Sequence, residues 1–389
     1  MARTRQGEVR TKSVKKGNAK TKSRSKAAVR AKSTAKAKGG TASKARPVPK
    51  AKKRGRFLRK VFALLAWLCL LAALLGTASR ELPEELQSLP YVPAVVSLAP
   101  WFALLALLAL ILSLASRRWF AALLALACLG LQGWRQYPYF APSMHLDTAA
   151  VSAVSGNHAD THDSYARVMT ANVYKGRADA KAIVEAVRDQ RVEVLALQET
   201  TKPFVRALKD AGINDYLPYS QISSSDGKYG NALFSATALD SPADDDVDSS
   251  ASFMPGGTVS FADGKTPIRF VSVHTTSPKP GYWTKWRTSL DEVAAMRSHK
   301  DARYIFMGDF NATTDHTPFR NILGSRFRDA AQSSGSGFVF TWPADRVGIP
   351  KFAGIDHIVL DQGITAGQVS TLSIPGSDHA ALLATIAVQ

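Results

Sequence analysis

The chain has 389 residues, of which 46% are hydrophobic and 21% are charged. This composition excludes a fully disordered or fibrous protein and allows one or two packed domains. The formal net charge of +19 comes from residues 1–60, which hold 23 of the 50 Lys and Arg and only one acid, Glu8. Overall basicity is therefore no sign that the folded part binds nucleic acid. Cys69 and Cys128 both lie in apolar runs, which excludes a disulfide framework and a thiolate metal site.

Residues 1–60 consist mainly of Lys, Arg, Ala, Ser, Thr and Gly. Such a segment cannot bury enough apolar surface to fold, so we predict a disordered basic tail in the cytoplasm. Its basic side chains suit the anionic headgroups of membrane lipids. The alternative partner of the tail is a nucleic acid, bound through its phosphates.

Three apolar stretches follow the tail, at residues 61–78, 92–115 and 119–134, and none contains Asp, Glu, Lys or Arg. The third covers only about 24 Å of a bilayer core that is about 30 Å thick. Trp119 and Trp134 stand at its ends, where an interfacial aromatic belt would lie. We therefore predict an anchor of three transmembrane helices over residues 61–135.

The predicted topology is that of a multi-pass protein of the cell membrane. Basic residues just before the first apolar stretch place the N-terminus in the cytoplasm. Three spans then put everything after about residue 136 outside the cytoplasm. If the third stretch is re-entrant, the same domain faces the cytosol.

After a linker at residues 136–164, the pattern becomes that of an α/β domain over residues 165–389, the size of one large domain. Helices are expected at residues 178–190 and 284–299. Strands are expected at residues 165–173, 192–197, 231–235, 258–261, 268–274, 304–307, 355–360 and 380–388.

Polar side chains stand at the ends of these apolar strands, where an amide, carboxylate or imidazole needs a partner. They are Asn172, Gln198, Glu199, His274, Asp309, Asn311, Asp356 and His357. Any one of them alone is more often a cap or turn residue. As a set they are rich in oxygen ligands, which suits a hard cation such as Mg²⁺ or Mn²⁺ and the attack of water on a phosphoryl centre.

Seven short motifs contain these residues or follow them in the chain. They are Thr170-Ala171-Asn172-Val173, Leu197-Gln198-Glu199-Thr200, Gly230-Asn231-Ala232-Leu233, Val273-His274, Gly308-Asp309-Phe310-Asn311, Ile355-Asp356-His357-Ile358 and Gly376-Ser377-Asp378-His379. In these motifs and in their order the chain resembles the endonuclease/exonuclease/phosphatase superfamily. The resemblance implies a four-layer α/β/β/α sandwich, with two sheets face to face and helices outside.

The resemblance also implies roles for individual residues. Glu199, with Asn172 and Asp378, would hold the divalent cation, whose charge offsets the charge that develops on the phosphate oxygens. Asp309 would orient the attacking water or accept its proton. Asn311 would fix that water and the phosphate.

Three imidazoles take different roles in the same scheme. Protonated His379 would bond a non-bridging oxygen or assist the leaving group, and Asp356 would hold its ring and raise its pKa. His274 would contact the phosphate from the opposite sheet. His357 alternates to the other face of its strand, so we predict a structural role for it.

We therefore predict a membrane-anchored, Mg²⁺- or Mn²⁺-dependent phosphoric ester hydrolase that cleaves phosphodiesters, of a lipid headgroup or a nucleic acid. One alternative is an extracellular nuclease of the same family. Another is a non-catalytic binding module, tethered by the basic tail. Tyr282, Trp283 and Trp286 form either a lip that touches the substrate or part of the core.

Overall fold

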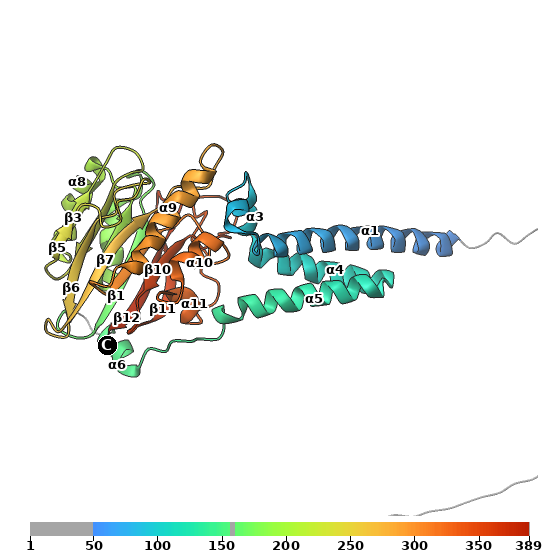
Figure 1. The fold of residues 1–389 in the computed structure, drawn as a ribbon, viewed down its shortest axis with the longest axis horizontal. Coiled ribbons are helices and arrows are strands. Elements are labelled where there is room, and N and C mark those ends of the chain that lie inside the picture. The colour runs from blue at the N-terminus through green and yellow to red at the C-terminus, as the bar shows by residue number, and fades with distance from the viewer. Residues whose placement is uncertain (1–49, 156–159, 389) are drawn as a thin grey trace, which may run out of the picture. The chain divides into compact units, whose positions relative to one another are not determined.

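The structure, a computed structural model, describes residues 50–155 and 160–388. Two six-stranded sheets dominate residues 165–388 (Figure 1). Sheet A has the order β11 (Ile364–Ser373), β12 (Ala380–Val388), β1 (Tyr165–Asn172), β2 (Val192–Gln198), β4 (Asn231–Ser235) and β3 (Tyr219–Ser223). Sheet B has the order β5 (Asp240–Ala243), β6 (Gly256–Phe261), β7 (Thr266–His274), β8 (Tyr304–Asp309), β10 (Asp356–Leu360) and β9 (Arg328–Asp329).

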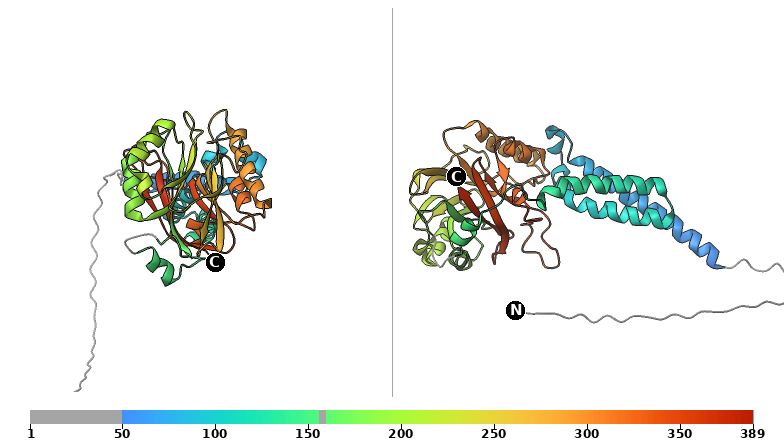
Figure 2. Two further views of the ribbon diagram at one scale, coloured as in Figure 1. Left: turned by 90° about the vertical axis from the view of Figure 1, so that its left-hand side faces the viewer. Right: turned by 90° about the horizontal axis from the view of Figure 1, so that it is seen from below.

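Helices cover the outer faces of both sheets (Figure 2). On sheet A, α7 (Ala180–Gln190) and α8 (Lys202–Asp210) pack apolar side chains such as Ile183 and Phe204 against β1 and β2. On sheet B, α9 (Trp283–Ala295) and α10 (Thr317–Leu323) do the same through Trp286 and Phe319. A third apolar cluster joins the inner faces of the two sheets. This mixed α/β domain with two sheets has the layers that the resemblance implies.

Local sequence explains where the helices of sheet A begin. The carboxylate of Asp179 accepts hydrogen bonds from the backbone N–H groups of Lys181 and Ala182, and the Thr201 hydroxyl caps α8 in the same way. The described part of the linker contains a short α-helix, α6 (Thr148–Ala153), capped by Asp147. Another short helix, α11 (Ala330–Ser333), follows β9.

Among the described residues, three long apolar helices precede the linker: α1 (Lys50–Ser79), α4 (Phe102–Ser116) and α5 (Trp119–Gln136). Small and apolar side chains pack between them, among them Leu70, Ala109 and Ala125. By length and composition, residues 54–79 and 99–116 are apolar enough to cross a membrane. Helix α5 is not among the helices that are long and apolar enough, so the third span stays a prediction.

The structure differs from the sequence-based expectation at the end of the basic tail. Residues 50–60, expected to be disordered, are the first part of α1. Lys, Arg, Ala and Leu are good helix formers, and the last proline of the tail is Pro49. Residues 1–49 lie outside the described residues.

The second difference lies in the middle of the predicted anchor. The stretch expected as one helix over 92–115 is divided into α3 (Val92–Val96), a 3₁₀ turn at Ala99–Trp101, and α4. Pro100 lacks the N–H that a continuous helix needs there. A further short helix, α2 (Glu84–Gln87), lies between α1 and α3.

Candidate active site

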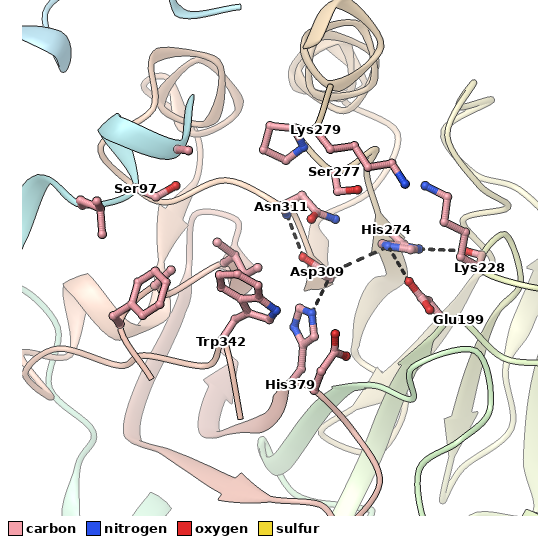
Figure 3. Close-up of a pocket in the computed structure, with 17 residues that line it drawn as sticks. Ser97, Glu199, Lys228, His274, Ser277, Lys279, Asp309, Asn311, Trp342 and His379 are labelled. Carbon is pink, nitrogen blue, oxygen red and sulfur yellow. Dashed lines mark hydrogen bonds and ion pairs between the residues drawn. The ribbon is translucent and has the colours of Figure 1, made fainter. Parts of the chain in front are cut away.

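The polar strand ends meet at one end of the two sheets. In sheet A, β1 runs parallel to β2, and β12 runs antiparallel to β1, so the C-terminal ends of β1 and β2 lie beside the start of β12. In sheet B, β7 and β8 are parallel and β10 is antiparallel, which aligns His274 and Asp356 with Asp309. The resulting pocket is shown in Figure 3. Its volume is about 550 Å³. Of the predicted site residues, Glu199, His274, Asp309, Asn311, Asp378 and His379 line it.

Asp309 lies at the centre of this site and is almost fully buried. Its Oδ2 accepts a hydrogen bond from the Asn172 amide at 3.0 Å, and its Oδ1 accepts one from the Asn311 backbone N–H at 2.8 Å. The Nε2 atoms of His274 and His379 each lie 3.7 Å from Asp309 Oδ2. Burial raises the pKa of this carboxyl, while the charge of His379 opposes the rise. A residue of sheet A thus orients the central carboxylate of sheet B.

The two histidines next to Asp309 are in different electrostatic environments. His379 Nδ1 lies 2.8 Å from Asp356 Oδ2. Burial lowers the pKa of His379, but Asp356, Asp309 and Asp378 outweigh it and raise the pKa to about 10. Burial, together with the positive charges of Lys228 and His379, lowers the pKa of His274 to about 3. At neutral pH the site therefore holds one imidazolium, His379, and one neutral imidazole, His274.

Two neighbouring carboxylates have oxygens without a partner. Glu199 Oε2 and Asp378 Oδ1 are buried and have no hydrogen-bond partner among the described residues. Burial raises the pKa of both carboxyl groups, and the charge of His379 opposes the rise. Glu199 also has a φ of 60°, a left-handed backbone conformation that is uncommon for a side-chain-bearing residue and recurs at functional sites. Buried, unpaired carboxylate oxygens are suited to a hard cation.

Other predicted residues are close by and are bonded through some of their polar atoms. The Asn172 carbonyl oxygen of the side chain accepts the Tyr174 backbone N–H at 2.9 Å. Asp309, Asp356 and His379 also offer three ligand atoms within 4.8 Å of one another. In that group His379 Nδ1 is bonded to Asp356, which leaves only Nε2 as a nitrogen ligand. Asp356 Oδ1 is also buried without a partner among the described residues, so Glu199, Asp378 and Asp356 each keep one carboxylate oxygen free for a cation.

Helix α9 supports the loop after β8 through a hydrogen bond. Trp286 is fully buried, and its indole N–H donates to the Asn311 carbonyl at 2.9 Å. The Asn311 amide in turn donates to the Thr275 carbonyl at 2.9 Å. Trp286 is thus a core residue that supports the site, whereas Tyr282 is 36% exposed.

His357 lies away from the pocket, as its position on the strand predicts. Its Nδ1 lies 2.7 Å from Asp329 Oδ2, and its Nε2 lies 2.8 Å from the Ala312 carbonyl oxygen. The ring is buried beside Phe319. It ties β10 to β9 and to the loop after β8.

Several pocket residues do not follow from the sequence pattern. Lys228 and Lys279 project toward the pocket from loops on either side of His274 (Figure 3). Burial and the neighbouring Lys279 lower the pKa of Lys228. The Pro-Lys-Pro-Gly turn shortly after the His274 strand is a signal that could have identified Lys279. Trp342 and Ser97 also reach the pocket, and no motif marks them.

A family model described as Endonuclease/Exonuclease/phosphatase family matches residues 169–379. That range contains all eight predicted catalytic and metal-ligating residues. No curated protein matches the chain.

Solved structures with a similar chain include truncated TDP2 of Caenorhabditis elegans, with 17% identity over 58% of this chain and 98% of that chain and a TM-score of 0.46. D. rerio TDP2 complexed with single strand DNA product has 19% identity over 58% of this chain and 99% of that chain, with a TM-score of 0.47. An endonuclease/exonuclease/phosphatase family protein from Bacteroides thetaiotaomicron has 15% identity over 58% and 98%, with a TM-score of 0.47.

Proposed function

Because the chain belongs to the endonuclease/exonuclease/phosphatase family, we propose that its strand-end site hydrolyses phosphoric esters with a divalent cation, and phosphodiesters in preference to monoesters. The observation that carries this proposal is the position of Asp309. It lies within 3.7 Å of both His274 and His379, and the Asn172 amide orients it. A buried carboxylate beside one charged and one neutral imidazole suits general-base activation of water.

Glu199 and Asp378 are the residues proposed to hold the cation, Mg²⁺ or Mn²⁺, with the side-chain carbonyl oxygen of Asn172 as a third ligand. Their unpartnered buried oxygens support this assignment. When bound, the cation supplies positive charge that offsets the charge developing on the phosphate oxygens. The group formed by Asp309, Asp356 and His379 is the alternative cation site.

The chain's own residues carry the remaining steps of the proposed reaction. Asp309 accepts a proton from water as the water oxygen bonds to phosphorus in line with the departing ester oxygen. The Asn311 N–H holds Asp309 at 2.8 Å, so that its other oxygen, Oδ2, faces the histidines. His379, kept protonated by Asp356, donates to a non-bridging oxygen or to the departing oxygen. Lys228 and Lys279 attract the anionic substrate into the pocket.

We also propose that α1, α4 and α5 anchor the protein in the cell membrane, with the N-terminus in the cytoplasm and the domain outside. Large apolar side chains on all three helices support this, since Leu64, Ile111 and Leu123 are more than half exposed. Trp119 and Trp134 are exposed at the two ends of α5. Protease added to intact cells should then cleave the domain, and protection of residues after 140 would contradict the orientation.

The enzymatic proposal is tested with the full chain in detergent. The substrates are bis-p-nitrophenyl phosphate, plasmid DNA and phospholipids, each with Mg²⁺ and with EDTA. We expect turnover of the small diester that EDTA abolishes and Mg²⁺ restores. Cleavage of plasmid DNA alone favours the extracellular nuclease. Absent or EDTA-insensitive turnover of every substrate favours the non-catalytic module.

A further inference from the structure

One wall of the pocket comes from outside the α/β domain. Ala94, Ser97 and Leu98, in the segment between the first two apolar helices, line the pocket together with the catalytic residues. Figure 3 shows Ser97 on the side of the pocket opposite Glu199 and Lys228. We call residues 80–101 the anchor segment. The cavity is therefore not complete without a part of the chain that lies between two membrane-type helices.

The anchor segment is bonded to the domain along its length. The Arg80 guanidinium lies 2.6 Å from Asp315 Oδ1. The buried Gln87 amide donates to the Thr317 hydroxyl at 2.8 Å and accepts from the Thr317 backbone N–H at 2.8 Å. His316 Nε2 lies 2.9 Å from the Pro93 carbonyl oxygen. These partners belong to the loop after β8 and to the start of α10, so the segment is fixed next to the catalytic residues.

The side of the pocket nearest the anchor segment is apolar. Trp342, Phe352, Ala353 and Ile355 line it with Leu98. Trp342 and Phe352 pack edge to face, with 5.5 Å between their ring centroids. The Trp101 indole N–H donates to the Phe352 carbonyl at 2.9 Å, which joins this side to the anchor segment. Trp342 and Phe352 are half-buried and Ala353 and Ile355 are buried, so this side of the pocket offers a substrate apolar contacts and no charge.

The loop between Trp342 and Phe352 carries a further apolar feature. Val347 is fully exposed at its tip, and Ile349 is 51% exposed. Arg346 beside them has a side chain that is 61% exposed and lies 3.3 Å from Asp345 Oδ1. Exposed apolar side chains such as Val347 and Ile349 mark an interaction surface, which a bilayer next to the domain would suit.

We infer that Leu98 of the anchor segment and the wall of Trp342 and Phe352 bind an apolar chain of the substrate, so that the enzyme selects phosphodiesters that carry an acyl or alkyl group. This inference rests on the proposed function and names its substrate class. The phosphate lies between Lys228, Lys279 and His379, and the apolar chain lies toward Leu98. The source of such a diester is a membrane phospholipid or a free amphiphile.

The test compares pairs of diesters that differ only in their chains. The full chain in detergent micelles is assayed with phosphatidylcholine and phosphatidylglycerol, and with the corresponding deacylated glycerophosphodiesters. Dihexanoyl phosphatidylcholine below its micellar concentration separates a free amphiphile from a membrane lipid. Bis-p-nitrophenyl phosphate reports the proposed hydrolase activity independently.

Leu98→Gln places a polar side chain in the apolar wall, and Phe352→Ala removes an aromatic ring from the same wall. The matched control is Val95→Gln, because Val95 has a similar exposure, 40% against 37% for Leu98, lies three residues away and does not line the pocket. We expect the wild-type protein to prefer an acylated diester at least about tenfold in kcat/KM. Leu98→Gln and Phe352→Ala should each reduce that preference about tenfold. Val95→Gln should leave the preference unchanged.

Other outcomes overturn the inference. It fails if the wild-type protein hydrolyses bis-p-nitrophenyl phosphate but shows no preference for acylated diesters, or prefers plasmid DNA; the proposed function then still stands. It also fails if both wall variants lower all activities in the same proportion, because the wall then only supports the fold. If no diester is hydrolysed at all, the proposed function fails with it.

Discussion

Replacing Glu199 by Gln tests the cation site with almost no change in side-chain shape. Glu199 Oε2 is buried without a partner among the described residues, and the side chain follows β2 directly into the pocket. The substitution removes a charged ligand of the proposed cation. The cation is the group that offsets the negative charge of the transition state. We expect kcat/KM for the small diester, measured at a fixed Mg²⁺ concentration, to fall at least about 100-fold, which corresponds to about 2.7 kcal/mol.

The same substitution has an opposite effect on the cation-free fold. Burial raises the pKa of Glu199, so the folded state disfavours the ionised carboxylate, and stability falls as the pH rises above the ordinary pKa of the group. The neutral amide of E199Q carries no such penalty, so the variant should melt at or above the wild-type temperature in EDTA. At a Mg²⁺ concentration of about 100 times the wild-type Kd, the wild type gains about 2.7 kcal/mol. A variant with about 100-fold weaker binding gains only about 0.4 kcal/mol.

The assay is steady-state hydrolysis of bis-p-nitrophenyl phosphate over a Mg²⁺ titration, with thermal melts of the same samples. Glu193→Gln is the matched control, since Glu193 is a buried glutamate at the opposite end of the same strand and does not line the pocket. Retained Mg²⁺-dependent turnover in E199Q would refute the metal role of Glu199. So would an equal Mg²⁺-induced stabilisation of variant and wild type.

Three further substitutions address the structure around the site. Burial and, to a lesser extent, the charge of Asp163 raise the pKa of Glu193 from 4.5 to about 8. The folded protein should therefore lose at most about 5 kcal/mol of stability between pH 4.5 and pH 8. Thermal melts of Glu193→Gln should lack that loss, and equal pH dependence in both proteins would contradict the argument. Gln87→Ala removes its bonds to Thr317 and the Arg80 carbonyl and should cost about 2–4 kcal/mol in a denaturation series, while the neighbouring Ser88→Ala stays close to the wild type. Trp286→Phe leaves the Asn311 carbonyl without its donor and should lower kcat/KM for the small diester about tenfold; unchanged kinetics would show that the Asn311 loop needs no such support.

The sequence predicted that the central residues of the candidate site lie together, and strand order and strand direction bring them to one pocket. Asn172, Glu199, His274 and Asp309 each end or follow an apolar run that the sequence marks clearly as a strand. Parallel neighbours then place their C-terminal ends side by side. The family resemblance added Asp378 and His379, which precede β12.

Other elements lacked a readable signal. β3 has the sequence Tyr-Ser-Gln-Ile-Ser, and its side chains are exposed or half-buried, so alternation of apolar and polar residues is weak. β11 is interrupted by a bulge between Gly367 and Ser370. Helix α10 has only seven residues and depends on a side chain from the anchor segment, Gln87, to bond its first N–H.

The anchor segment was the largest difference from expectation, and the reason is physical. Hydropathy treats residues 92–115 as one apolar run, because it measures composition and not continuity of the helix. Pro93 and Pro100 each start a new short element, and the turns between them pack on the domain. A pocket wall made from such a segment depends on tertiary contacts, such as that between Pro93 and His316, which sequence spacing does not encode.

The division of the candidate site between the sheets has a consequence for how the proposed activity can change. The whole of sheet B, residues 240–360, is one insertion between β4 and β11 of sheet A, so the chain passes from one sheet to the other only twice among the described strands. The proposed cation ligands all come from sheet A, whereas Asp309, Asn311 and His274 come from the insertion. In the proposed arrangement, a small movement of the insertion would change the rate of turnover without changing the affinity for the cation. Substitutions between the two sheets are therefore the changes best suited to adapt this protein to other substrates.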